Sequence, residues 1–286
     1  MKRLFSIAQG LFIALMFAIY AGQANAITVS QLGTGLLVPS VIHNGAGVDT
    51  LVGITNGYSS PVIVYWTFFD VNGNPVTNSN FTIPSYGFYP FDWKDKAASF
   101  ANQEGYLVFT VGDGSGNIIF GNFLLADAFL VDTTAKDAAW VPVLTLNGPS
   151  DYKPGINLNS MGPDSIKKTS YSTHVDHWIH FWIDPAFGAT TTIKFWTVCN
   201  TTTALSEFFG TDGSITESVF SLPNTRLNTI DPATLAPPGS LSGHFIIGIH
   251  DSSCPGGGGP NSAIVFAYIE SAAIGARQTV LGGGAM

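Results

Sequence analysis

The sequence predicts an all-β protein made of two tandem β-sandwich modules of the immunoglobulin or fibronectin type. Short runs of Val, Ile, Phe, Tyr, Trp and Thr are separated by clusters of Gly, Asn, Asp, Pro and Ser, which is the pattern of strands and turns. Similar blocks recur about 140 residues apart. Each half holds about seven short strands with a turn every 8 to 12 residues, the rhythm of such sandwiches. The alternative is one large β-sandwich built from both halves.

The N-terminus has the parts of a secretory signal peptide over residues 1–26. Lys2 and Arg3 supply the positive charge, residues 11–20 form an apolar run, and small residues end at Ala26. The run of about ten residues is shorter than the ~20 that a transmembrane helix needs. We therefore expect cleavage after Ala26 and a secreted or periplasmic mature chain without a transmembrane segment.

An internal repeat follows the signal peptide. Five blocks occur in the same order in both halves: residues 50–56 and 192–200, 68–73 and 208–213, 81–84 and 220–223, 105–113 and 243–251, and 118–123 and 264–268. Five collinear matches indicate a duplicated module. The expected domains are a first module at 27–132, a connecting loop at 133–173 rich in Gly, Pro, Asn, Ser and Lys, and a second module at 174–286.

Some strand sequences are apolar at successive positions, as in residues 117–131. A strand of a lone sandwich should alternate between apolar and polar side chains. We therefore expect part of an outer sheet face to pack against the other module or against a neighbouring subunit of a homo-oligomer.

The composition is poor in charge. Charged residues make up 10% of the chain, its formal net charge is -8, and 45% of its residues are hydrophobic. A nucleic-acid surface needs clustered Lys and Arg, so nucleic acid is excluded as a partner. A protein or glycan partner outside the cytoplasm is the expectation.

The chain has two cysteines, Cys199 and Cys254. Export places them in an oxidising compartment, where paired cysteines form disulfides. We expect one disulfide bond between them.

Histidines are concentrated in the second half, where His177, His180, His244 and His250 are candidate metal ligands. In a strand, His177 and His180 point to opposite faces. A site would therefore join one of these two with His244 or His250 on a neighbouring strand, and zinc or copper suits imidazole ligands. The alternative is that these histidines are packed or lie on the surface without a metal, and no other cofactor is expected.

Aromatic residues gather in one short segment, at Tyr86, Phe88, Tyr89 and Trp93. Such clusters are typical of protein-docking or sugar-stacking surfaces. The alternative is that they form a core between the modules.

Catalytic motifs are missing from the sequence: it has no G-x-S-x-G, H-E-x-x-H, Walker or G-x-G-x-x-G pattern. The sequence therefore predicts an exported, non-catalytic binding or structural protein of the cell envelope or extracellular space. Two alternatives remain open, a zinc- or copper-binding protein that uses the histidines and a carbohydrate-binding or carbohydrate-active protein.

Overall fold

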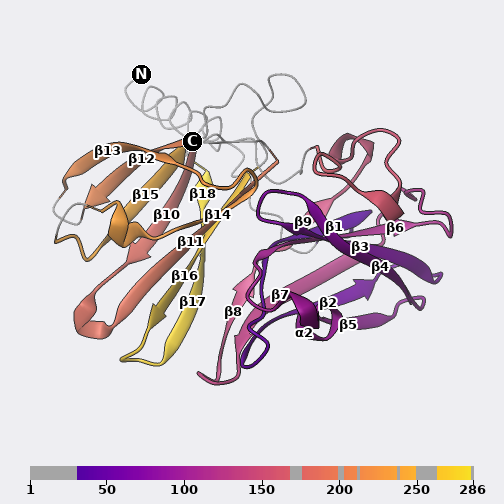
Figure 1. Ribbon diagram of the computed structural model, residues 1–286, viewed down its shortest axis with the longest axis horizontal. Coiled ribbons are helices and arrows are strands. Elements are labelled where there is room, and N and C mark those ends of the chain that lie inside the picture. The colour runs from indigo at the N-terminus through magenta and orange to yellow at the C-terminus, as the bar shows by residue number, and fades with distance from the viewer. Residues whose placement is uncertain are drawn as a thin grey trace, which may run out of the picture.

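The described part of the protein is built mainly of β-strands with only short helices, which confirms the all-β part of the predicted fold class. The computed structural model describes residues 31–167, 176–198, 203–210, 213–236, 239–248 and 263–284. These residues form eighteen strands in four sheets, arranged as two units that lie side by side (Figure 1). The predicted signal peptide, the cysteine pair Cys199 and Cys254, and His250 lie outside the described residues.

The first unit is a sandwich of a five-stranded and a four-stranded sheet. The five-stranded sheet has the order β4 (Pro75–Ile83), β3 (Val62–Asp70), β6 (Gly105–Gly112), β1 (Gly35–Val41) and β9 (Leu144–Leu146). The four-stranded sheet has the order β5 (Phe88–Asp92), β2 (Val48–Asn56), β7 (Leu124–Asp132) and β8 (Asp137–Val141). The short helices are α2 (Trp93–Lys96), η1 (Ala98–Phe100), η2 (Pro149–Asp151) and η3 (Leu158–Ser160). None of the helices in the described part of the chain is long and apolar enough to cross a membrane.

The second unit has the same construction. Its five-stranded sheet has the order β13 (Ile215–Ser221), β12 (Thr203–Gly210), β15 (Ser242–Gly248), β10 (Asp176–Trp182) and β18 (Gly283–Gly284). Its four-stranded sheet has the order β14 (Leu227–Ile230), β11 (Ala189–Thr197), β16 (Ala263–Ser271) and β17 (Ala276–Leu281). The short helices η4 (Pro185–Phe187) and η5 (Pro232–Thr234) lie in its loops.

Strand order is identical in the two units, since adding nine to each strand number of the first unit gives the second. The four sheets form two sandwiches rather than one large one. The order differs from the immunoglobulin constant domain, in which the first two strands share a sheet. Here β1 lies beside β6 in the five-stranded sheet, whereas β2 lies in the opposite sheet.

Two equivalent turns show which residues of the first unit correspond to which residues of the second. Residues 133–136 join β7 to β8 and residues 272–275 join β16 to β17. Both turns have four residues, and the last residue of each has a positive φ, 57° at Lys136 and 63° at Gly275. The residues that precede these turns therefore occupy equivalent positions.

The β ladders carry this register into neighbouring strands. Asp132 pairs with Val48, and Ser271 pairs with Ala189. Val48 and Ala189 are therefore equivalent, and each residue further along β2 has its counterpart on β11.

Two threonines at equivalent positions make the same hydrogen bonds between the sheets. The Thr50 hydroxyl accepts a hydrogen bond from the Ile42 N–H at 3.0 Å and donates one to the Ile42 carbonyl oxygen at 2.9 Å. The Thr191 hydroxyl makes both bonds with the backbone of Trp182, at 2.8 Å each. The repeat therefore extends to individual side chains.

Two glycines mark a second equivalence. Gly105 is the first residue of β6 and Gly243 is the second residue of β15. A Cβ on Gly105 would collide with the carbonyl oxygen of Phe69, and a Cβ on Gly243 with that of Phe209. Only glycine permits this approach of two strands. The glycines occupy equivalent positions, as in the predicted blocks 68–73 with 208–213 and 105–113 with 243–251. The block that matched residue 50 with residue 192 is out of register by one, because Thr50 corresponds to Thr191. The block at 118–123 is wrong, because it lies in a loop while its supposed match lies in β16.

The predicted loop at 133–173 is more structured than expected. It contains β8 and β9, which complete the two sheets of the first unit. We name residues 149–167 the connector; it lies on the outer face of the five-stranded sheet, where Tyr152 and Leu158 are buried. The Tyr152 hydroxyl lies 3.2 Å from Oγ1 of Thr110 on β6. Residues 137–146 are strongly apolar, which is the sequence signal of these two strands, whereas the connector is interrupted by Pro and Gly.

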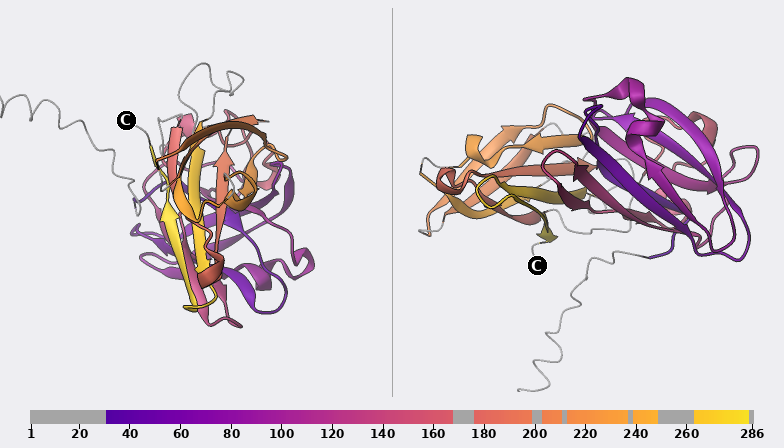
Figure 2. Two further views of the ribbon diagram at one scale, coloured as in Figure 1. Left: turned by 90° about the vertical axis from the view of Figure 1, so that its left-hand side faces the viewer. Right: turned by 90° about the horizontal axis from the view of Figure 1, so that it is seen from below.

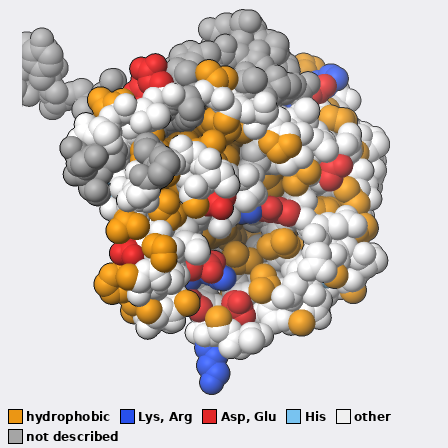
Figure 3. Space-filling view, turned by 60° about the vertical axis from the view of Figure 1, so that its left-hand side comes forward, with side chains coloured by type: hydrophobic (Ala, Val, Ile, Leu, Met, Phe, Trp, Pro, Cys, Tyr) orange, Lys and Arg blue, Asp and Glu red, His pale blue; other side chains and the backbone are white. Residues whose placement is uncertain are grey.

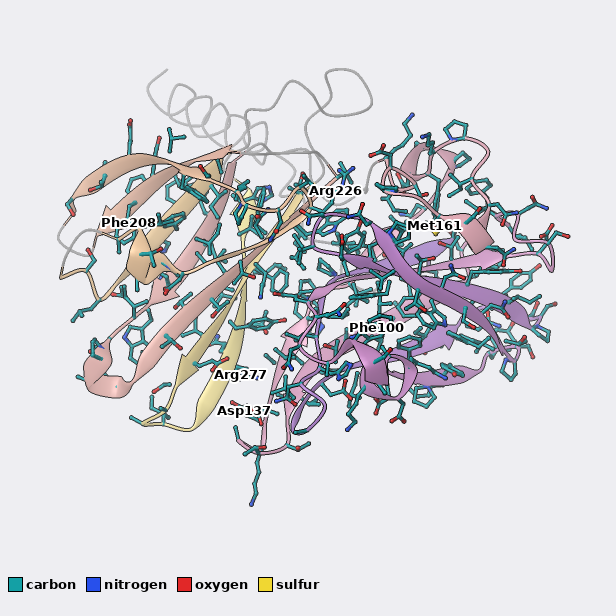
Figure 4. The ribbon with its side chains drawn as sticks, viewed as in Figure 1. Phe100, Asp137, Met161, Phe208, Arg226 and Arg277 are labelled. Carbon is teal, nitrogen blue, oxygen red and sulfur yellow. The ribbon has the colours of Figure 1, made fainter. Side chains whose placement is uncertain are left out.

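The units meet along a seam. The outer face of the second unit's four-stranded sheet packs against the first unit, and its side chains join the first unit's core; they are Trp196, Val198, Leu227, Ile264, Phe266 and Tyr268. Figure 2 shows the two sandwiches as separate bodies in contact along this seam. Arg226 and Arg277 lie toward the first unit (Figure 4), and Arg226 binds Asp164 of the connector at 2.7 Å. An outer sheet face is thus buried between the units, but it is not the face from which burial was expected. The outer side chains of β7, within residues 117–131, stay open to solvent, with Phe129 exposed by 43%.

Candidate functional site

The outer face of the second unit's five-stranded sheet is the first candidate site, and we name it the second-unit face. Side chains along β10, β15, β12 and β13 alternate between the core and this face. Its described members are Trp178, His180, Glu207, Phe209, Ile215, Glu217, Val219, His244 and Ile246. Trp178, Ile215 and Val219 are exposed by 37%, 62% and 69%. The face is thus broad and open to solvent, with large apolar side chains beside two acids and two histidines.

Two of the predicted metal ligands meet on the second-unit face. His180 and His244 are direct partners across β10 and β15, and their ring centroids lie 5.2 Å apart. Beside them, Trp178 stacks on Phe209 with centroids 5.3 Å apart. Burial, and then the neighbouring His244, lower the pKa of His180, while a backbone hydrogen bond at Gly243 opposes them. The arrangement favours a neutral imidazole at His180.

Of the other candidate ligands, the structure describes only His177, which does not join this pair. His177 is buried and lies on the opposite side of β10 from His180, as its strand position predicted. Protein zinc sites use three or four protein ligands. Within the described ranges, no group of three or more His, Cys, Asp and Glu side chains is placed to hold a metal ion. His180 and His244 alone would supply two ligands.

The predicted aromatic surface is divided by the structure. Tyr86 and Phe88 are exposed by 71% and 62%, and Tyr89 is half-buried and stacked on Phe81 at 3.9 Å. Trp93 is buried in the first unit's core, so its assignment to a surface was wrong. Asp92 ends β5 and caps α2, and the chain turns there so that the Trp93 ring enters the core.

Phe88 belongs to a second open surface, the outer face of the first unit's four-stranded sheet, which we name the first-unit face. Its members are Leu51, Gly53, Thr55, Phe88, Pro90, Leu125, Asp127 and Phe129. They line a hollow of about 590 Å³. The hollow exists because Gly53 has no side chain, and the Phe88 ring leans over it. A glycine inside a strand is the sequence signal of such a close approach, and Gly53 was not among the predicted site residues.

One pair of acids lies at the edge of the first-unit face. Asp49 is buried, and its Oδ1 accepts hydrogen bonds from the N–H groups of Thr50 at 2.7 Å and Lys94 at 3.0 Å. Burial, then a hydrogen bond to Asp92 and its charge, raises the pKa of Asp49 to about 6. Carboxyl groups in direct hydrogen bonding are closer than the ~5 Å or more that separates a glycosidase pair. The two acids therefore stabilise the start of α2 rather than flank a glycosidic bond.

Comparisons with known proteins give no family. No protein-family model and no curated protein matches the chain. Solved structures match over most of its length. They include a mutant of Bacillus subtilis oxalate decarboxylase, at 10% identity, 88% coverage of this chain, 69% of that chain and a TM-score of 0.19. The Pleurotus ostreatus lectin matches at 12% identity, 92% and 79% coverage and a TM-score of 0.18, and vicilin from Capsicum annuum at 7%, 87%, 76% and 0.22. Scores this low carry no argument about the site.

Proposed function

We propose that this chain is an exported, non-catalytic binding or structural protein of the cell envelope or extracellular space, acting through the outer faces of its sheets. One observation carries the proposal: each unit has a broad sheet face whose large apolar side chains are open to solvent. Contiguous exposed apolar patches mark interaction surfaces. Uncharged side chains dominate the surface seen in Figure 3, which supports recognition by apolar burial rather than by charge.

Export rests on the sequence of residues 1–26. The repeated strand order, the matched threonines and the matched glycines support descent of the two units from one duplicated module.

Photo-crosslinking in the native cell tests the proposal. A photoreactive amino acid replaces Phe88 on the first-unit face, Val219 on the second-unit face or, as a control, exposed Asn80 of β4, which lies on neither face. We expect a mature chain that begins at Ile27 outside the cytoplasm and discrete adducts from the two faces only. An uncleaved cytoplasmic chain, or faces that give no adduct, would overturn the proposal.

The histidine pair supports a second candidate, binding of zinc or copper. The observation in its favour is the 5.2 Å separation of the His180 and His244 rings. Titration of either metal into the purified chain tests it. Binding of one ion per chain that is lost in both His180→Ala and His244→Ala supports the site, and binding unchanged in both variants removes it.

A further inference from the structure

The seam inside the chain shows how one unit of this type binds another. Trp196 of the four-stranded sheet lies 5.6 Å, between ring centroids, from Tyr106 of the first unit. Tyr106 in turn stacks on Phe69 at 4.9 Å. Beside them the Leu227 N–H donates a hydrogen bond to the Val71 carbonyl oxygen at 2.9 Å. A four-stranded sheet of one unit thus packs on an aromatic pair of the other unit's five-stranded sheet.

The first-unit face is the equivalent of the four-stranded side of the seam. Counting along β2 and β11 from Val48 and Ala189 makes Thr55 the counterpart of Trp196. Thr55 pairs with Phe88, as Trp196 pairs with Leu227. Leu227 is buried in the seam, whereas Phe88 is open to solvent.

The second-unit face is the equivalent of the five-stranded side. Because Gly243 corresponds to Gly105, His244 corresponds to Tyr106. His244 pairs with Phe209 as Tyr106 pairs with Phe69. The aromatic pair that receives Trp196 in the first unit therefore has an open counterpart in the second.

The buried ion pair of the seam has no charged counterpart on the two open faces. At the seam Lys194 binds Glu104 at 2.7 Å, and both side chains are largely buried. Their counterparts are the uncharged Gly53 and Ser242, so contact between the faces strands no partner of this ion pair. The faces do carry acids, Asp127 on the first-unit face and Glu207 and Glu217 on the second-unit face, and the cost of removing these carboxylates from water opposes the contact.

We propose that copies of this chain associate head to tail, with the first-unit face of one copy packed on the second-unit face of the next. The inference rests on the proposed function and names the partner of its two faces as a second copy. The seam uses the outer face of the second unit's four-stranded sheet and the outer face of the first unit's five-stranded sheet. The first-unit face and the second-unit face, one of each type, stay free. Such a contact is heterologous, so it produces a ring or an open filament rather than a closed dimer.

Sedimentation velocity of the purified mature chain tests this association, with three variants. Phe88→Glu blocks the first-unit face, His244→Glu blocks the second-unit face, and Asn80→Glu is a control of equal charge. We expect the wild type and the control to form species larger than dimers as concentration rises. Each face variant alone should associate at least about tenfold more weakly, since an unpaired charge enters the contact. An equimolar mixture of the two face variants should form a dimer and nothing larger, because each retains one working face.

A wild-type chain that stays monomeric, or assembly that both face variants leave unchanged, overturns the inference. Crosslinks in the cell to a different protein from both faces, with a monomeric purified chain, would keep the proposed function and reject the second copy as partner.

Discussion

The two five-stranded sheets have the same strand order but different surroundings. In the first unit, every residue of β1 and β6 is buried on both sides of the sheet. The connector covers one end of the outer face, through Tyr152 and Leu158, and the second unit covers the other. In the second unit, Trp178 and His180 of β10 are exposed on the equivalent face.

Two units with the same strand order can therefore have different exposed faces, so strand order alone does not determine which sheet face is free to contact a partner. Tyr106 is buried under the seam, while its counterpart His244 is open to solvent. The face becomes interior or surface according to what the rest of the chain lays over it. Substitutions at equivalent positions of the two units should therefore have different effects where one position is buried and the other is exposed.

The largest expected difference is between two tryptophans, Trp196 in the seam and Trp178 on the second-unit face. Trp196→Ala should lower the free energy of unfolding by about 3 to 5 kcal/mol, because it leaves a cavity between the units. Trp178→Ala should cost about 1 kcal/mol or less, as for a surface residue. Chemical denaturation monitored by circular dichroism measures both. Equal losses would mean that the second-unit face is covered in solution.

The acid pair of the first unit predicts a pH dependence that the second unit lacks. Asp49 has Thr190 as its counterpart, so only the first unit has the buried acid. Its pKa of about 6, above the ordinary 3.8, means that the native state holds the proton more tightly than the unfolded chain. The stabilisation is present below pH ~4 and is lost as the pH rises through 6.

Asp49→Asn should therefore become more stable relative to the wild type by up to about 3 kcal/mol between pH 4 and pH 7.5. Thermal unfolding of both proteins across this range measures the change. Asp231→Asn, at the equivalent of Asp92 in the second unit, is the matched control. A stability difference between Asp49→Asn and the wild type that does not change with pH would contradict the raised pKa of Asp49.

The matched threonines predict matched losses. Thr50→Val and Thr191→Val each remove a hydroxyl that serves one N–H and one carbonyl, and each should cost about 1 to 3 kcal/mol. Thr50→Ser and Thr191→Ser keep the hydroxyl and should recover most of the loss. Urea unfolding gives the four values. A large loss in one unit and none in the other would break the equivalence of the two sandwiches.

The histidine pair gives the smallest effect. The pKa of His180 is lowered, so the unfolded chain takes up this proton more readily and acidification slightly disfavours the native state. His244→Ala removes one of the two lowering causes and should raise the pKa of His180, while burial keeps it below the ordinary value. An NMR titration of the His180 ring measures this change. An unchanged pKa of His180 would show that the His244 ring does not influence it.

Much of the fold was readable because the signals were local. Alternating strands and turns predicted the all-β class, and the paired glycines at 105 and 243 fixed the repeat. Strand geometry also predicted that His177 and His180 face opposite ways, although it left open which of them would meet His244 or His250. In each case the backbone period decided the outcome.

Features that depend on tertiary contacts could not be predicted from the sequence. Trp93 stands in an aromatic segment with Phe88, yet Asp92 turns the chain between them and sends one ring inward and the other outward. The hollow at Gly53 depends on three strands distant in sequence. Which sheet face is covered depends on where the connector lies, and no local pattern carries that information.

Association of two copies through the open faces can be tested by crosslinking from Thr55, the counterpart of Trp196, with a photoreactive amino acid at this position of the purified mature chain. We expect an adduct of two copies whose crosslinked peptide contains Phe209 or His244, the counterparts of the residues that receive Trp196. An adduct that maps to another surface, or a chain that yields none while its seam remains intact, would contradict the claim that the open faces repeat the contact inside the chain.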